Sequence, residues 1–463
     1  MTRRIVLLGA MWCPTCKELY KNLVEEFGVD NIDYIDLDRY PHILSRYKIA
    51  GYPALAFIDS NELKYIETTL DLEQIRWNYK YMDELSISRE LLRCPMKYGT
   101  GEIKREHILR IISNIERNFD WVNGGLYGEY KRFPFEVAEF MLRMYLVWGV
   151  DGYLNMIHKT IDIILQSKMF DYKRYMISRI SYTPDWDDPD RIYLLEDQAR
   201  FAKILMYIYL ITKNKLYFDL ARDMVKSINK YFLFKDDIYR AYIDDKPITP
   251  TYPHILYNML SHLAEMSIDR EIARYTINLT KYFDDIESVV RARGYLYLGD
   301  LIAYGDASIK FYEAFRWSKG VRIMNTLSKI IDRLGDNNLY RDIDKSILKP
   351  LDNWRCIPFK ENILLSILLH RYSIHIDNED FLMLSKNITE LLDPTEIRDL
   401  DILSIYGMNL ANHLYSIDKI LIYGYDRVPS KVSQVFKPYI LITYRDSHEK
   451  YVEYISKDFK FRM

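Results

Sequence analysis

The sequence predicts a multidomain chain, in which an N-terminal α/β domain precedes a larger all-α domain and a small α/β appendage. In the first part, apolar β-branched runs alternate with amphipathic helical segments. From Ile103 to Tyr415 the apolar residues recur at helical spacing, and β-branched runs follow. These observations predict an α/β domain at 1–80, a connector at 81–102, a helical domain at 103–415 and an appendage at 416–463.

The composition is typical of a soluble globular protein. The 463 residues are 49% hydrophobic and 28% charged, and the net charge of -2 gives no reason to expect binding to nucleic acid or to an anionic membrane. The run Ile363–Leu369 is too short to cross a bilayer, and Cys13 follows the N-terminal apolar run too closely for a cleaved secretory signal. We therefore expect a cytoplasmic protein. Its 41 tyrosines and many isoleucines favour a thermophilic source.

Each element of the N-terminal domain has a local signal. Pro14 suits the first position of a helix, Leu19 and Leu23 lie on one face of it, and Gly28 offers its stop. Asp71 is a capping residue for the last helix. The predicted order is strand Arg4–Leu8, helix from Pro14, strand Asp33–Asp38, short helix Pro41–Lys48, strand within Gly51–Ile58, strand Leu63–Glu67 and a helix after Asp71.

Two thiols lie three positions apart in the segment Trp-Cys-Pro-Thr-Cys that ends at Cys16. Such a pair can form a disulfide or supply half of a metal site. A structural zinc ion usually takes four ligands, and Cys94 and Cys356 are single and distant in the sequence. We therefore favour redox chemistry over zinc and expect no metal site, while a pair retained only for packing is the other alternative.

Together with this motif, the order of elements over about residues 4–80 resembles that of thioredoxins. The resemblance implies that Pro53 is cis and faces the dithiol, and that the backbone of Tyr52 pairs with a substrate strand. We predict a substrate-binding surface of Trp12, Tyr52 and Pro53. Thioredoxins have a buried aspartate six residues before the first cysteine, where this chain has Leu7. This difference implies slower reduction of a mixed disulfide, or a different base.

The expected chemistry follows from the helix that begins at Pro14. Its N-terminus carries partial positive charge and free N–H groups, which stabilise the thiolate of Cys13. Cys13, at the exposed end, would attack a substrate disulfide, and Cys16, one turn inward, would resolve the mixed disulfide. The expected partner is a disulfide-containing protein or a small thiol. No cofactor is expected beyond the redox-active Cys13–Cys16 disulfide.

The helical segments predict an (α/α)6 six-hairpin barrel, which requires about a dozen helices in up-and-down order. We see no strict repeat that would indicate a solenoid. The appendage is predicted as strands Lys419–Tyr423 and Tyr439–Thr443 flanking a helix at Lys431–Phe436. The predicted helices are Ile103–Phe119, Phe135–Trp148, Tyr153–Met169, Tyr193–Thr212, Leu216–Phe232, His254–Met266, Glu271–Phe283, Ile309–Phe315, Val321–Leu334, Glu361–Ile374, Glu379–Leu391 and Asp399–Tyr415.

Several motifs resemble those of the spermatogenesis-associated protein 20 family, which is also met in bacteria and archaea. Ile35–Arg39 with Pro41 resembles its Val-Asp-Arg-Glu-Glu-Arg-Pro, and Gly51-Tyr-Pro resembles its Gly-Trp-Pro. Gly124–Pro134 resembles its Gly-Gly-Phe-Gly…Pro-Lys-Phe-Pro, and Leu194–Arg200 its Met-Leu-Tyr-Asp-Asn-Ala-Gln. The resemblance implies a compact member, with a thioredoxin-like domain joined to a barrel of the kind found in sugar-processing enzymes. The family usually shows Trp-Cys-His at its cysteine, and its His-Phe-Glu-Lys is missing before Leu194.

Candidate site residues of the barrel lie on predicted loops and near helix starts. They are Trp121, Glu129, Lys131, Trp186, Asp187, Asp197 and His254. Carboxylates beside a tryptophan suit glycoside hydrolysis or sugar binding, although acidic Pro-rich loops are commonly solvated connectors. Asp197 interrupts an apolar helix, where an inward carboxylate is catalytic or hydrogen-bonded. Sugar epimerases with this barrel use paired histidines as acid and base; His254 and His262 are candidates, with packing or capping as the alternative.

The leading hypothesis from the sequence is a thiol–disulfide oxidoreductase whose helical barrel binds or positions a partner. The alternative is a carbohydrate-active barrel, epimerase- or glycosidase-like, with a sugar ligand and a regulatory or vestigial thioredoxin-like domain. A binding module or chaperone-like scaffold is the third class. Fold alone does not choose between them, since one fold hosts many functions. The sequence predicts neither the physiological substrate nor the oligomeric state.

Overall fold

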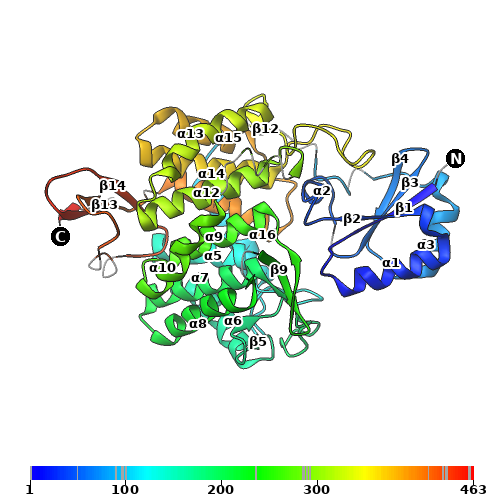
Figure 1. The fold of residues 1–463 in the computed structure, drawn as a ribbon, viewed down its shortest axis with the longest axis horizontal. Coiled ribbons are helices and arrows are strands. Elements are labelled where there is room, and N and C mark those ends of the chain that lie inside the picture. The colour runs from blue at the N-terminus through cyan, green and yellow to red at the C-terminus, as the bar shows by residue number, and fades with distance from the viewer. Residues whose placement is uncertain are drawn as a thin grey trace. The chain divides into compact units, whose positions relative to one another are not determined.

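The computed structural model describes residues 3–49, 51–88, 91–94, 99, 102–234, 237–283, 287, 290, 293–415, 417–429, 432, 436–456 and 460–462. The chain divides into two compact units (Figure 1). The sheet unit contains Met1–Lys97, Glu287–Gly299 and Ile331–Asn362, and the helical unit contains Tyr98–Ile286, Asp300–Ile330 and Ile363–Met463. Within the described part of the chain, no helix has both the length and the apolar character that a membrane span needs.

The sheet unit is built on four strands in the order β2-β1-β3-β4, with β1 parallel to β2 and antiparallel to β3. Its first elements are β1 (Arg3–Gly9), α1 (Pro14–Phe27), β2 (Ile32–Asp36), α2 (His42–Arg46), β3 (Ala54–Asp59), β4 (Glu62–Glu67) and α3 (Leu72–Lys80). Helix α1 begins at Pro14 and is capped by Gly28, as predicted. The Asp71 side chain accepts a hydrogen bond from the Glu73 N–H at the start of α3. The predicted α/β order is confirmed.

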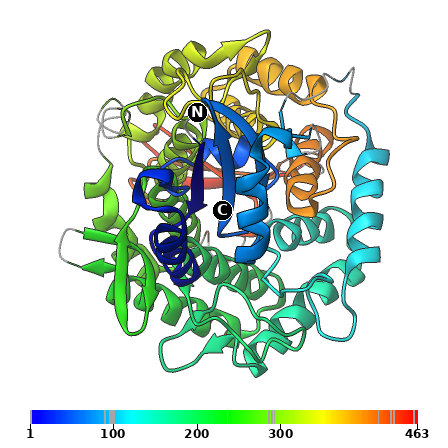
Figure 2. The same ribbon diagram turned by 90° about the vertical axis from the view of Figure 1, so that its right-hand side faces the viewer.

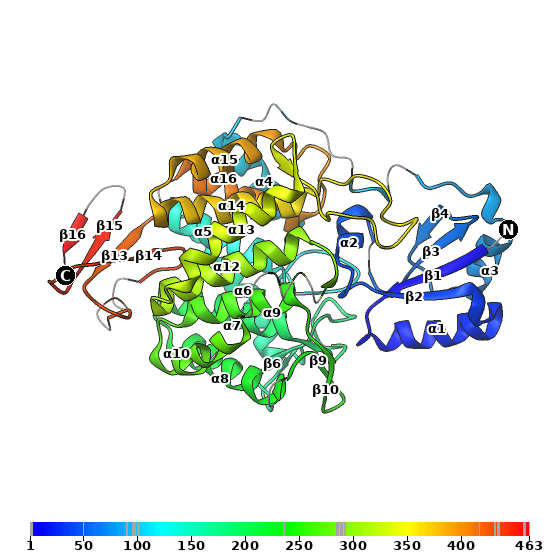
Figure 3. The same cartoon turned by 45° about the horizontal axis from the view of Figure 1, so that its top comes forward.

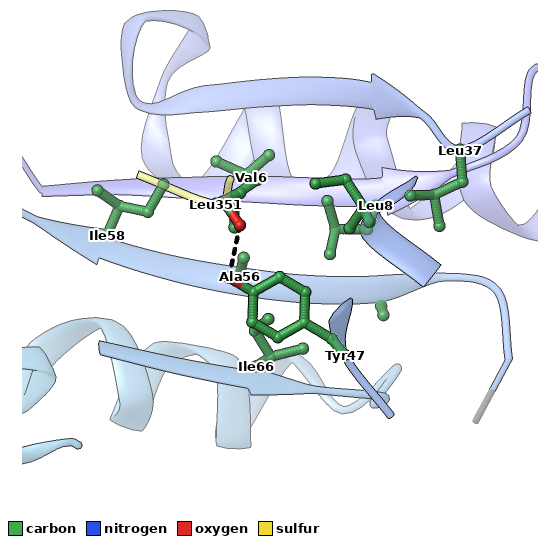
Figure 4. Close-up of a cluster of buried hydrophobic side chains, with 10 residues drawn as sticks. Val6, Leu8, Leu37, Tyr47, Ala56, Ile58, Ile66 and Leu351 are labelled. Carbon is green, nitrogen blue, oxygen red and sulfur yellow. Dashed lines mark hydrogen bonds between the residues drawn. The ribbon is translucent and has the colours of Figure 1, made fainter. Parts of the chain in front are cut away.

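A distant segment completes the hydrophobic core on one face of this sheet. Figure 4 shows the buried cluster, whose labelled members are Val6, Leu8, Leu37, Tyr47, Ala56, Ile58, Ile66 and Leu351. The Tyr47 hydroxyl donates a hydrogen bond to the carbonyl oxygen of Leu351 at 2.7 Å. Leu351 lies in Ile331–Asn362, which also contains β11 (Gly335–Asp336) and β12 (Leu339–Tyr340). The later segment is therefore an integral part of the sheet unit.

Buried polar contacts attach the same segment to α2, and a disulfide joins it to Cys94. The Arg46 guanidinium contacts both carboxylate oxygens of Asp342, at 2.7 and 2.9 Å. Cys94 and Cys356 form a disulfide across 262 positions of sequence, with Cα atoms 5.5 Å apart. The expectation that these two cysteines are single was wrong. No local pattern marks the pair, because only the packing of the later segment against α2 brings the thiols together.

The helical unit contains alternating exposed and buried helices, arranged in a ring (Figure 2). The helices that expose one face are α4 (Arg105–Asn118), α6 (Asp151–Gln166), α8 (Lys215–Tyr231), α10 (Arg270–Ile277), α13 (Lys319–Ile331) and α15 (Glu379–Leu391). The helices buried on most sides, which we call the inner helices, are α5 (Phe135–Trp148), α7 (Leu195–Thr212), α9 (Pro253–Met266), α12 (Leu298–Phe315), α14 (Phe359–Ile376) and α16 (Leu400–Leu414). This alternation agrees with the predicted series of helical hairpins.

Several boundaries differ from the prediction. Helix α12 begins at Leu298. The prediction placed its start at Ile309, because Gly299 and Gly305 interrupt the apolar pattern in the sequence. Gly305 packs tightly, since an added Cβ would lie 2.7 Å from Leu327. The remaining short strands were not predicted, because four of them have only two residues and the other two carry charged residues. They are β5 (Phe170–Asp171), β6 (Met176–Ile177), β7 (Tyr193–Leu194), β8 (Leu233–Phe234), β9 (Asp237–Ile243) and β10 (Lys246–Pro250).

The appendage contains a four-stranded sheet in the order β14-β13-β15-β16 (Figure 3). Its strands are β13 (Lys419–Tyr423), β14 (Leu441–Arg445), β15 (Tyr451–Ile455) and β16 (Lys460–Arg462). The first two were predicted, with β14 shifted by two residues. The last two were not predicted, because Glu453, Lys460 and Arg462 interrupt their apolar pattern. Most of the helix predicted at Lys431–Phe436 lies outside the described residues.

Candidate functional site

The dithiol lies at the N-terminus of α1, where its two cysteines form a disulfide. Cys13 is the N-cap residue, and its sulfur accepts a hydrogen bond from the Cys16 N–H at 3.2 Å. The side chain of Cys16 is fully buried, and Cys13 is only 5% exposed. The prediction of an exposed Cys13 was therefore wrong, while its place at the helix N-terminus was predicted correctly.

Trp12, in the turn before α1, is buried and contacts Asp38 and Tyr52. Its indole Nε1–H donates to the Asp38 carboxylate at 2.7 Å, and its ring lies edge-on to Tyr52 with centroids 5.9 Å apart. Trp12 is 2% exposed and Cys13 is buried beside it. The Tyr52–Pro53 peptide bond is cis, as the thioredoxin resemblance implies. Sequence reasoning missed Asp38, whose only signal was an acid at the end of a predicted strand.

Lys131 has a structural role in the loop between α4 and α5. Its ammonium group is buried and contacts the Asp120 carboxylate at 2.8 Å. It also donates to the carbonyl oxygens of Gly124 and Leu126, at 2.9 Å each. Burial opposes ionisation, but hydrogen bonds from Asn123 and Lys131 hold the pKa of Asp120 well below its usual range. All three donor positions of Lys131 are thus used within the loop.

Trp186 is also part of the interior rather than an exposed platform. Its indole N–H donates to the Asn123 carbonyl oxygen at 2.7 Å, and its side chain is fully buried. The ring covers Gly125, which has a φ of 68° and where an added Cβ would lie 2.8 Å from the ring. Trp186 therefore packs on Gly125 and holds the loop from Asp120 to Lys131 against the loop that follows α6.

We expect Gly125→Ala to destabilise the protein by about 2–4 kcal/mol, because a side chain there is strained by the left-handed backbone and clashes with Trp186. Gly149→Ala is the matched control. Gly149 has the same φ of 68°, but an added Cβ there meets nothing within 4 Å. The control should cost about 1 kcal/mol in urea unfolding. Equal costs for the two variants would contradict the close packing of Trp186 on this loop.

The other loop residues are at the surface or in local contacts. Trp121 is 51% exposed, and Glu129 is exposed on the same loop. An oxygen of Asp187 accepts a hydrogen bond from the Lys168 N–H at 3.0 Å. These contacts do not by themselves indicate a catalytic role.

His254 and His262 are not a catalytic pair. They lie two turns apart on α9, which separates them by roughly 12 Å along the axis. The His254 N–H and Nδ1 both contact the Asp300 carboxylate, at 3.0 and 3.4 Å. Burial, together with the charge of Lys203, lowers the pKa of His262 well below its usual value. His262 is therefore a neutral interior residue, while His254 is held at the helix start.

Carboxylates gather at the first turns of the inner helices. Glu136 lies in the first turn of α5, Asp197 in that of α7 and Asp401 in that of α16. Helix α5 contacts both of the other helices. An acid in the first turn is favoured by the helix dipole, so its position alone does not indicate function. Arg132, just before α5, forms an ion pair with Asp401 and interacts electrostatically with Glu136 and Asp197. We call Arg132, Glu136, Asp197 and Asp401 the first-turn cluster.

Two members of the first-turn cluster have strongly shifted acidity. Burial raises the pKa of Asp197 to about 6, against the lowering effect of Arg240 and Arg132. Burial and the charge of Glu136 raise the pKa of Asp401 to about 6, against Arg132. Oδ1 of Asp401 has no hydrogen-bond partner among the described residues. Near pH 6, each of these carboxyl groups exchanges readily between its protonated and its ionised form, which suits proton transfer.

Charges further along the inner helices are engaged with one another. The buried contacts join Glu139 to Arg200 and Lys203, Glu265 to Lys310, and Glu313 to Arg371 and His375. Buried ions need such partners to offset their desolvation. These contacts tie neighbouring inner helices together, so we regard them as structural and the first-turn cluster as the candidate site. Sequence reasoning found Asp197 but missed Asp401 and Arg132. Asp401 was missed because an acid two residues after Asp399 resembles an ordinary helix cap.

Comparisons with known proteins agree with the barrel. No protein-family model and no curated protein sequence matches the chain. Among solved structures, a sugar epimerase from a ruminal bacterium is similar with a TM-score of 0.54 and 12% identity, over 66% of this chain and 98% of that one. The cellobiose 2-epimerase of Bacillus thermoamylovorans has a TM-score of 0.52 and 11% identity, over 66% of this chain and 99% of that one. The helical part therefore has the (α/α)6 fold of these carbohydrate enzymes, and an N-terminal α/β sheet region accompanies it.

Proposed function

We propose that the helical unit is a carbohydrate-active barrel, in which Asp197 and Asp401 transfer a proton to and from a sugar. The observation that carries this proposal is the first-turn cluster, where Arg132 forms an ion pair with Asp401 and interacts electrostatically with Asp197, and burial raises the pKa of both carboxyls to about 6. Acid–base catalysis is most effective when the pKa of the catalytic group lies near the working pH. This was the alternative hypothesis from the sequence.

The two similar structures support a specific reaction class. Both are epimerases, and one is named for C2 of cellobiose. Epimerisation at C2 removes the proton beside the aldehyde carbon of the open-chain sugar and returns a proton to the other face. One carboxylate would take the proton and one carboxylic acid would supply it. The exposed Arg132 guanidinium would stabilise the negative charge that develops on the sugar oxygen.

The test uses the full chain with cellobiose or D-glucose in deuterated water. Proton removal at C2 exchanges that hydrogen for deuterium, so proton NMR should show loss of the C2 signal and the growth of the C2 epimer. Exchange at C2 that depends on the protein would support the proposal. If neither sugar exchanges and neither raises the unfolding temperature, the proposal is wrong for these sugars as substrates.

A second candidate function is thiol–disulfide exchange in the sheet unit, and one specific arrangement favours it. A disulfide-forming CxxC pair begins α1, and a cis proline follows the aromatic Tyr52, whose ring meets Trp12. From these features we infer that the sheet unit is a thioredoxin-like domain. From the motifs at Ile35–Arg39, Gly124–Pro134 and Leu194–Arg200 we infer that the chain is a compact relative of the spermatogenesis-associated protein 20 family. Its partner would be a disulfide-containing protein or small thiol. The burial of Cys13 makes this the second candidate, because the attacking thiol must meet its substrate.

We expect Cys16→Ser to trap a mixed disulfide through Cys13, because the resolving thiol is gone. Incubation with oxidised glutathione followed by mass spectrometry would detect the adduct on the Cys13 peptide. Cys13→Ser is the matched control and should trap no adduct at Cys16, which is fully buried. Adducts of equal yield on both variants would contradict the assigned roles of attacking and resolving thiol.

A further inference from the structure

The hydroxyl of Tyr34 borders the same small space as the sulfur of Cys16. Strands β1 and β2 are parallel, with Leu7 paired to Tyr34 and Gly9 paired to Asp36. Gly9 has no side chain, and a Cβ added there would lie 2.9 Å from the Tyr34 hydroxyl oxygen and 3.0 Å from the Cys16 sulfur. Gly9 thus leaves room for both groups, which arrive from β2 and from α1.

The Tyr34 hydroxyl is a free donor in this space. It is buried and has no hydrogen-bond partner among the described residues. The third of the three atoms nearest to the added Cβ belongs to the apolar side chain of Leu7, at 2.9 Å. Burial, with the charges of Asp36 and Asp38, raises the pKa of Tyr34 well above its usual value, so the phenol stays protonated. A buried phenol of this kind gains most from an anionic acceptor.

Cys16 needs such a donor more than Cys13 does. Cys13 is the N-cap residue and receives the backbone N–H of Cys16, so the helix itself stabilises its thiolate. Cys16 is fully buried within α1, where an unpaired thiolate is costly. Cys13 lies beside it on α1, and Asp36 and Asp38 act electrostatically on Tyr34 from the same strand and the turn that follows. The two carboxylates are acceptors and would repel the thiolate.

We propose that the Tyr34 hydroxyl donates a hydrogen bond to the thiolate of Cys16 while that cysteine resolves a mixed disulfide. The inference rests on the thiol–disulfide exchange proposed above. In this step the Cys16 thiol loses its proton, its sulfur bonds to the sulfur of Cys13, and the bond between Cys13 and the substrate breaks. The substrate leaves as a thiolate that takes up a proton, so protons balance, and two electrons pass from the dithiol to the substrate. Tyr34 keeps its own proton throughout.

The test is a single turnover of the reduced full chain with 5,5′-dithiobis(2-nitrobenzoate), which releases one coloured thiolate when Cys13 attacks and a second when Cys16 resolves. Tyr34→Phe should slow the second phase about tenfold or more, the cost of losing a hydrogen bond to a charged group. The first phase should be unchanged. The midpoint of the second phase against pH should move to higher pH, which loss of packing alone would not cause.

Tyr20→Phe is the matched control, because the Tyr20 ring packs edge-on against Tyr34 at 5.7 Å and the change likewise removes one hydroxyl. It should leave both phases intact, and Cys13→Ser reports any colour released by other cysteines. If the wild-type protein shows both phases and Tyr34→Phe matches it in rate and pH midpoint, the role of Tyr34 is overturned while exchange stands. If the wild-type protein shows no first phase, the exchange function itself is wrong.

Discussion

Asp401→Asn and Asp197→Asn are each expected to lower the rate of C2 proton exchange by about 10²–10⁴-fold, the range for a lost general acid or base. Asparagine keeps the size of the side chain but can neither accept nor deliver the proton. Both carboxyls have pKa values of about 6, so the wild-type rate should change with pH around that value. Each variant should lose one limb of that profile. NMR of the sugar in deuterated water measures the rates.

Asp399→Asn supplies the control for these variants. Asp399 lies two residues before Asp401 and caps α16, accepting hydrogen bonds from the N–H groups of Asp401 and Ile402. Asparagine caps a helix about as well as aspartate, so this variant removes a neighbouring carboxylate and keeps the helix start. Its exchange rate should stay near that of the wild-type protein. Loss of activity in the control alone, or equal activity in all three variants, would contradict the assignment of the acid–base pair.

Local signals explain why the α/β part was predictable from the sequence. Pro14 and Gly28 mark the ends of α1, Asp71 marks the start of α3, and β-branched runs mark the strands. Each signal acts through the backbone within a few residues. The helical hairpins were predictable for the same reason, since an amphipathic or buried helix shows its periodicity locally. Helix α12 was shortened in the prediction because its glycines contribute close packing rather than apolar side chains.

The sites were less predictable because burial is decided by distant parts of the chain. Lys131 and Trp186 have the residue types of a sugar site, yet the fold turns both inward to support a loop. Asp401 resembles a capping residue in the sequence, and only its proximity to Arg132 and Glu136 makes it a candidate. The disulfide between Cys94 and Cys356 and the contact of Arg46 with Asp342 join segments that no local pattern relates.

The second large effect concerns the sheet unit, where Arg46→Met is expected to lower the free energy of unfolding by about 3–5 kcal/mol at neutral pH. Arg46 and Asp342 are almost completely buried, and the guanidinium also donates to the Trp354 carbonyl oxygen at 2.6 Å. Removing the cation leaves Asp342 buried without its partner. Urea unfolding of the full chain would measure the lost free energy of unfolding. Hydrogen exchange of the backbone amides in β1 and β3 would assign that loss to the sheet unit.

The double variant Arg46→Met with Asp342→Leu separates the effect of the buried charge from that of packing. It should recover much of the lost free energy of unfolding, because apolar pairs often replace buried ion pairs without cost.

The stability of the single variant Arg46→Met should also depend on pH. Burial already raises the pKa of Asp342 to about 6 despite Arg46, and loss of Arg46 raises it further. The folded variant then binds a proton that the unfolded chain releases near pH 4. Its stability should therefore fall as pH rises from about 5 to 8, and a loss independent of pH would mean that the uncompensated carboxylate is not its cause.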